Sequence, residues 1–182
     1  MRTALSIIIP FLCLTLSARA AFAVGKETLV DLSGVAVVVD EVSSTAKADG
    51  LTGDAVKALV EDKLTRANIT VLEDKKWFTV FGGSYLLVKI IASRSTDGNR
   101  YAVYVGTDLY QTVVITGKKL GKNITTAAAT WSVGKLLSCE TAVLRECVGG
   151  TVSDLTDMFI KDFTEVKTAK WKQEQEWREK NK

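Results

Sequence analysis

Two β-rich runs separated by a short turn constrain the fold of this chain more than any other feature. Ser84–Ser93 reads SYLLVKIIAS, and Arg100–Thr116 reads RYAVYVGTDLYQTVVIT. Asp97-Gly98-Asn99 lies between them and is typical of a hairpin turn, because Gly and Asn tolerate the backbone angles that such turns need. Neighbouring side chains in a strand point to opposite faces. We therefore expect an antiparallel hairpin at the centre of the fold.

Further strands are expected on both sides of this hairpin. Leu29–Val42 is rich in Val, and its uninterrupted apolar stretch predicts burial on both faces, as in a central strand. Ile124–Val133 is expected to return beside the hairpin after a basic turn at 117–123. Two shorter strands are expected before the hairpin, at Ile69–Leu72 and, irregularly, at Trp77–Phe81.

Two amphipathic helices complete the pattern. Thr52 is a good N-cap for the first, whose apolar residues recur every three or four positions until Asn68, a residue that tolerates a left-handed cap. The second runs from position 141 or 142 to about Val166, unless Gly149-Gly150 delays its start to about position 151 or 153. The order strand-helix-strand-strand-strand-strand-helix predicts an α+β domain: one antiparallel sheet of about five strands with two helices on one face.

The N-terminal residues 1–23 have the layout of a secretory signal peptide. Arg2 is a positive n-region, Ala4–Leu16 is an apolar run too short for a comfortable membrane span, and two A-x-A frames follow. We expect cleavage between Ala23 and Val24, which leaves a soluble, periplasmic chain with a single domain at 24–166. An uncleaved N-terminal anchor is the alternative. Residues 167–182 are expected to form a charged, partly helical or frayed tail.

Several short motifs follow one another along the mature chain in a recognisable order. They are Gly50-Leu51-Thr52 before the first helix, Ser84–Val88, Tyr101–Val105, Thr130-Trp131-Ser132 and Asp154–Ile160. In this order they resemble an uncharacterised family of small exported, periplasmic α+β proteins of Gram-negative bacteria. The resemblance covers most of the mature chain. It implies a compartment and a fold class, and it brings no catalytic residue with it.

Export decides how the cysteines are interpreted. Cys13 leaves with the signal peptide, so Cys139 and Cys147 remain, and two thiols in an oxidising compartment commonly pair. On one regular helix their spacing would place them about 12 Å apart, which is too far for a disulfide. Pairing therefore requires Cys139 to lie before the helix and to fold back on its first turns. Two buried free cysteines are the alternative.

The composition excludes several kinds of catalytic site. The chain has no His, so Ser-His-Asp triads, Cys-His pairs and imidazole metal sites are absent. Ser44-x-x-Lys47 and Ser132-x-x-Lys135 match the spacing of serine acyl enzymes, but two matches in so short a chain indicate chance. Asp154 and Asp157 are interpreted as solvated or capping carboxylates. We expect no enzymatic activity, cofactor or metal; a hydrolase using these carboxylates or Ser/Lys pairs is the weakest alternative.

Basic and aromatic residues indicate where a partner would bind. Lys118, Lys119 and Lys122 form a basic hairpin tip, and the tail adds Trp171 and Trp177. Such residues can contact an envelope protein or an anionic membrane surface, whereas a net charge of +3 is too small to indicate nucleic acid. The chain is thus predicted to be a partner-binding or envelope-assembly accessory module. Its oligomeric state stays open.

A carrier of a small lipid or metabolite is the alternative function. It would need a pocket between the sheet and the helices. The candidate lining residues are aromatic: Tyr85, Tyr104, Tyr110, Trp131 or Phe159.

Overall fold

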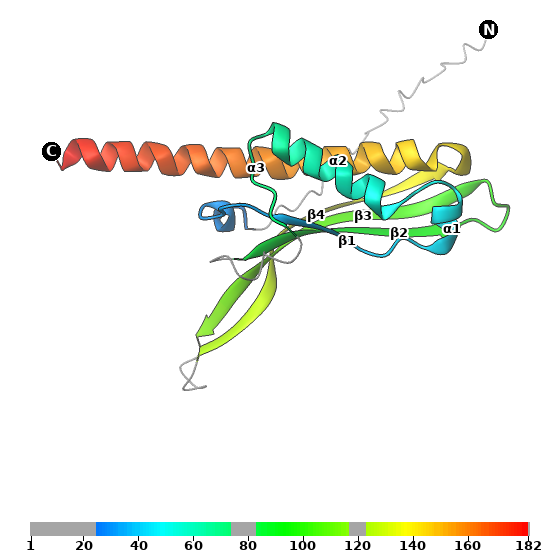
Figure 1. Cartoon of the computed structure of the whole chain (residues 1–182), viewed down its shortest axis with the longest axis horizontal. Helices are drawn as coiled ribbons and strands as arrows, with labels where there is room; N and C mark the ends of the chain where they lie inside the picture. The colour runs from blue at the N-terminus through cyan, green and yellow to red at the C-terminus, as the bar shows by residue number, and fades with distance from the viewer. Residues whose placement is uncertain (1–24, 74–82, 117–122, 182) are drawn as a thin grey trace, which may run out of the picture.

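The computed structural model describes residues 25–73, 83–116 and 123–181 of the 182-residue chain. One sheet in the order β1-β2-β3-β4 lies beneath the helices (Figure 1). Its strands are β1 (Ala36–Val39), β2 (Ser84–Arg94), β3 (Arg100–Thr116) and β4 (Asn123–Glu140). The helical elements are η1 (Lys26–Leu29), α1 (Ser44–Ala48), α2 (Gly53–Arg66), η2 (Thr141–Val143) and α3 (Leu144–Lys180). The signal-peptide segment and the strand expected at Trp77–Phe81 lie outside the described residues.

The central hairpin is confirmed. β2 and β3 pair antiparallel, from Ser84 opposite Gln111 to Arg94 opposite Tyr101. In the turn, Gly98 has φ +74° and the Asp97 carboxylate accepts hydrogen bonds from the Ser95 hydroxyl and the Asn99 backbone. The Ser95 hydrogen bond, followed by the Asn99 backbone bond, lowers the pKa of Asp97.

The prediction of an all-antiparallel, five-stranded sheet is wrong. The sheet is mixed and has four strands, because β1 pairs parallel with β2. A parallel partner requires a crossover connection, which α1 and α2 supply. The fifth strand expected at Ile69–Leu72 is reduced to one isolated parallel bridge between Val35 and Val71. The described residues therefore form an α+β architecture with one strand fewer than expected.

The first predicted strand, Leu29–Val42, is also shorter than expected. Only Ala36–Val39 is strand, and Leu29 ends the 3-10 helix η1 with its side chain fully buried. Gly34 separates the two parts and lies so close to the backbone that a Cβ built there would be 2.6 Å from the Thr70 carbonyl oxygen. Apolar side chains at this end are therefore buried by a turn and a coil that pack on the core.

The first amphipathic helix is confirmed as α2. The Thr52 hydroxyl accepts a hydrogen bond of 3.3 Å from the Ala55 N–H, and Asn68 has φ +57° just beyond the helix. The buried residues of α2 are Val56, Val60 and Leu64. The short helix α1 replaces the polar connector expected at 43–50, and its N-cap is Ser43.

The second helix is longer than predicted. α3 begins at Leu144, includes both Gly149 and Gly150, and continues through the predicted tail to Lys180. It crosses β3 and β4 and lies beside α2 (Figure 1). The connector expected at 136–140 is instead the end of β4.

The opposite face of the sheet carries no helix in the described part of the chain (Figure 1). A β-bulge between Leu109 and Tyr110 shifts the register, so that Leu109 faces Trp131 and Tyr110 faces Ala129. Beyond Gln111, where the pairing with β2 ends, β3 and β4 continue as a two-stranded ribbon that bends away from the helices (Figure 1). The sheet thus has one covered face and one open face.

Candidate functional site

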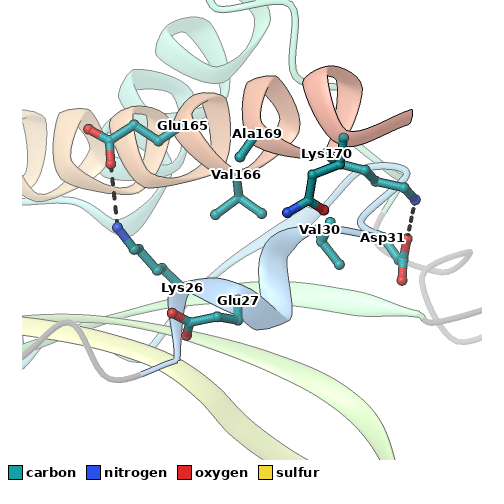
Figure 2. A pocket seen from close by; sticks show the side chains of 9 residues that line it. Lys26, Glu27, Val30, Asp31, Glu165, Val166, Ala169 and Lys170 are labelled. Carbon is teal, nitrogen blue, oxygen red and sulfur yellow. Dashed lines mark hydrogen bonds and ion pairs between the residues drawn. The ribbon is translucent and has the colours of Figure 1, made fainter. Parts of the chain in front are cut away.

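One of several surface hollows in the described residues lies between η1 and α3. It is a groove of about 550 Å³. Figure 2 shows η1 and its flanking residues on one wall and α3, from Glu165 to Gln173, on the other. The apolar floor consists of Val30, Val166 and Ala169.

Two ion pairs cross the groove and bind its walls together. Lys26 Nζ lies 3.7 Å from Glu165 Oε2, and Lys170 Nζ donates a hydrogen bond of 2.7 Å to Asp31 Oδ1 (Figure 2). A third lysine, Lys167, donates a hydrogen bond of 2.9 Å to the Leu32 carbonyl oxygen. These contacts fix α3 on η1 at the point where the helix leaves the sheet.

The Asp31–Lys170 pair carries the clearest electrostatic signal of the groove. The hydrogen bond from Lys170, and then its positive charge, lowers the pKa of Asp31. The same contact raises the pKa of Lys170. Both groups therefore stay charged over a wider pH range than usual, and the rim of the groove carries both signs of charge.

The predicted tail supplies the exposed aromatic residues. Trp171 is 60% exposed and Trp177 is 66% exposed. Six positions on an α-helix correspond to roughly 120° around its axis, so the two rings do not share a face. Trp177 lines the next hollow along the helix together with Lys170, which also lines the groove. The groove and the ring of Trp177 therefore form one continuous surface, which we call the α3 face, and Trp171 lies outside it.

Carboxylates that were candidates for chemistry are used in ion pairs. Asp157 Oδ2 lies 2.8 Å from Lys63 Nζ, which links α3 to α2. Asp154 Oδ2 lies 4.0 Å from Lys135 Nζ. Within the described ranges, no group of three or more potential ligands could hold a metal ion.

In both Ser/Lys motifs the lysine is paired with a carboxylate. Lys47 Nζ lies 3.3 Å from Glu41 Oε1, and Lys135 Nζ lies 4.0 Å from Asp154 of α3. Ser132 donates a hydrogen bond to Asp108, which also accepts one of 3.1 Å from Lys89. The hydroxyl of Ser132 thus belongs to a charged pair of the open face.

The aromatic residues proposed for a carrier pocket do not line one cavity. Trp131 and Phe159 are buried in the core, with their ring centroids 5.2 Å apart. Tyr104 lies on the open face, as do Tyr85 and Tyr110, which stack with centroids 5.0 Å apart. The sheet separates these two groups.

Cys139 lies before the helix and close to its first turns, as a disulfide with Cys147 requires. Cys139 lies near the end of β4 and Cys147 lies at the start of α3. Their Cα atoms are 6.0 Å apart, within the range that a disulfide spans. The pair joins the sheet to the first turns of the helix.

Sequence reasoning missed the groove. Asp31 and Lys170 are 139 positions apart, and no local pattern links them. The lysines of the basic tip, Lys118, Lys119 and Lys122, lie outside the described residues. Among the described helices, none is both long and apolar enough to cross a bilayer.

No family model and no curated protein matches the chain. Among solved structures, the chain is similar to a variant of PelC from Paraburkholderia phytofirmans, crystallised as a dodecamer. The identity is 14%, the TM-score is 0.41, and the match covers 68% of this chain and 87% of the other.

Proposed function

We propose that this protein is an exported, non-enzymatic binding module of the periplasm that holds a partner protein on its α3 face. The observation that carries the proposal is the continuity of that face. It begins in the groove between η1 and α3 and ends at an exposed indole, Trp177. A groove with an apolar floor and an aromatic anchor resembles the centre of many protein interfaces.

The compartment is proposed from the N-terminal segment and the cysteines. Residues 1–23 have the layout of a signal peptide. A cysteine pair at disulfide distance fits an oxidising compartment. An adaptor in the cell envelope would meet its partner there.

The chemistry of the α3 face favours an amphipathic partner segment. Val166 and Ala169 offer an apolar strip, while Lys26, Lys170 and Glu165 place both signs of charge beside it. A partner helix or loop with apolar residues flanked by acidic and basic ones would match this arrangement. The basic hairpin tip at Lys118, Lys119 and Lys122 stays a second predicted contact.

In-cell photo-crosslinking tests the proposal. A photo-reactive amino acid at Gln173, which lines both hollows, should give a discrete crosslinked species. Trp177→Ala should remove that species, because it removes the anchor. Trp171→Ala is the matched control, since it deletes an equally exposed indole from a different side of the same helix, and it should leave the species intact. Equal loss in both variants, or in neither, would refute the α3 face as the binding surface.

A small-ligand carrier remains a second candidate because of the size of the groove. About 550 Å³ lies within the usual range for small-molecule sites. A ligand with a short apolar body and a charged end would fit between Val166 and the ion pairs. A thermal-shift screen of lipids and metabolites checks this, and a genuine hit should be lost in Ala169→Trp, which fills the groove.

A further inference from the structure

The open face of the sheet carries an exposed apolar row that crosses three strands. Ile91 on β2 lies opposite Tyr104 on β3, and Tyr104 lies opposite Leu136 on β4. The three side chains are 64%, 37% and 76% exposed, respectively. The solvated face of an antiparallel sheet is normally polar, so such a row indicates a contact surface. We call it the Tyr104 row.

Two paired glycines lie beside this row and leave space for the ring of Tyr104. Gly106 and Gly134 are paired there, and the ring of Tyr104 lies over both. A Cβ built at these glycines would lie 2.7 and 2.5 Å, respectively, from the Tyr104 hydroxyl oxygen. The ring thus replaces two side chains with one planar surface that another molecule can approach closely.

Charged residues on this face are arranged around Tyr104. Asp108 lies toward the ribbon, with a side chain only 12% exposed that contacts Lys89. Arg100 lies toward the opposite end, with a side chain 64% exposed that contacts Glu140 at 3.8 Å. Arg100 and Asp108 are equally distant from Tyr104 along β3, and the alternation of the strand places both on the open face. Two ion pairs, Arg100–Glu140 and Asp108–Lys89, thus lie on opposite sides of the Tyr104 row, with Arg100 and Asp108 on the same strand.

We propose that the open face binds a second copy of this chain, with the two-fold axis running along the Tyr104 row. Rotation by 180° about this axis places the Tyr104 row of one chain over the Tyr104 row of the other. Each strand then runs antiparallel to the same strand of the second chain. The Arg100–Glu140 pair of each chain then lies opposite the Asp108–Lys89 pair of the other, which gives two reciprocal clusters with Arg100 facing Asp108. A two-fold interface requires such self-complementarity of a single patch.

The charges also decide between the two possible orientations. A two-fold axis parallel to the strands would also bring the Tyr104 rows together. It would, however, place Asp108 over the Asp108 of the second copy, and like charges in register are unfavourable. The axis along the row avoids this repulsion and is the one that the charge pattern favours.

The area of the patch predicts a weak, reversible dimer. From Arg100 to Asp108 across three strands, the projected area is roughly 27 Å by 14 Å per copy at standard strand dimensions. A standard stable interface buries about 800 Å² per partner. The ribbon bends toward the open-face side and would extend the contact around the end of the other copy (Figure 1). Because the projected area is about half of that of a standard interface, we expect a weak dimer whose population rises with concentration.

Sedimentation velocity of the mature chain from about 1 to 300 µM tests the proposal. The wild type should shift from monomer to dimer across this range. Leu136→Glu should raise the dissociation constant by more than about tenfold, because it buries a charge in the row. Trp177→Glu is the matched control on the α3 face and should leave self-association unchanged. This control separates the dimer from the proposed function.

A charge variant at the exposed Arg100 tests the orientation. Arg100→Glu places like charges opposite each other and should weaken the dimer, whereas Arg100→Lys should keep it. A monomer at every concentration, a larger assembly instead of a dimer, or a dimer indifferent to Leu136→Glu would overturn the proposal. Equal dimerisation by the Arg100→Glu and Arg100→Lys variants would overturn the proposed axis.

Discussion

The indole N–H of Trp131 donates a hydrogen bond of 2.9 Å to Asp162 Oδ2, which ties the middle of β4 to α3. Trp131 is 1% exposed, and the edge of its ring meets Phe159 of the same helix. A buried Trp is stable only when its polar N–H finds a partner. This contact therefore lets the largest side chain of the core enter it without an unsatisfied donor.

Removal of this acceptor should destabilise the protein. Asp162→Ala leaves the Trp131 N–H buried and unpaired, and we expect a loss of about 1.5–3 kcal/mol in the free energy of unfolding. Urea denaturation followed by tryptophan fluorescence measures it. Asp154→Ala, an exposed carboxylate on the same helix, should change stability by less than about 0.5 kcal/mol. Similar losses in the two variants would contradict the role of the Trp131 hydrogen bond.

Two glycine substitutions should change stability in opposite directions. Gly34→Ala places a Cβ 2.6 Å from a backbone oxygen that cannot rotate away, so we expect a loss of about 1–3 kcal/mol. Gly149→Ala meets nothing within 4 Å and improves helix propensity, so we expect a gain of roughly 0.5–1 kcal/mol. Thermal unfolding of the two variants compares them. A loss in Gly149→Ala would mean that α3 is not a regular helix there.

Reduction of the cysteine pair should lower the thermal stability. The loop that it closes is short, and the chain-entropy model then predicts about 2–3 kcal/mol of stabilisation. Because Cys139 is 2% exposed, reductant must act during unfolding, so melting curves with and without dithiothreitol give the measurement. The double variant Cys139→Ala, Cys147→Ala should melt at one temperature in both buffers. A wild type indifferent to reductant would show that the cysteines are not paired in solution.

The contact between η1 and α3 should be visible in the titration of Asp31. Its native pKa lies below the unfolded value of about 3.9, because Lys170 donates a hydrogen bond to it and adds a positive charge. The pair therefore stabilises the native state above that value, and the stabilisation is lost as pH falls through the native pKa. Carbon-detected NMR of the Asp31 carboxyl measures the shift.

A charge-neutral variant identifies the cause of that shift. Lys170→Gln should return the pKa of Asp31 toward its ordinary value. Lys172→Gln, on the same helix but without this contact, should not. A low Asp31 pKa that survives Lys170→Gln would assign the shift to another group.

The elements that could be predicted from the sequence depend on neighbours in the chain. The bounds of β3, the N-cap Thr52 and the left-handed Asn68 were all predicted, because alternation and capping are set within a few residues. The amphipathic stripe of α3 was also predicted, although its start and end were not.

The elements that were missed depend on distant partners. Leu29 was assigned to a strand because apolar composition alone does not distinguish a buried turn from a strand. Ile69–Leu72 forms only one bridge, between Val71 and Val35. Local sequence does not determine how many residues of a segment pair with a strand elsewhere in the chain. The order of the elements predicted the α+β class but not the parallel pairing of β1 with β2.

The candidate binding surfaces likewise combine features that the sequence predicts with features that only the packing reveals. The sequence by itself determined that Trp171 and Trp177 are exposed candidates in a charged helical segment and that no His-based chemistry is present. Only the tertiary structure decided that Trp177 continues a groove, that Trp171 does not, and that Ile91, Tyr104 and Leu136 form one row. The physical reason is that secondary structure follows from local backbone and side-chain preferences. A surface is instead assembled from residues that packing brings together across the whole chain.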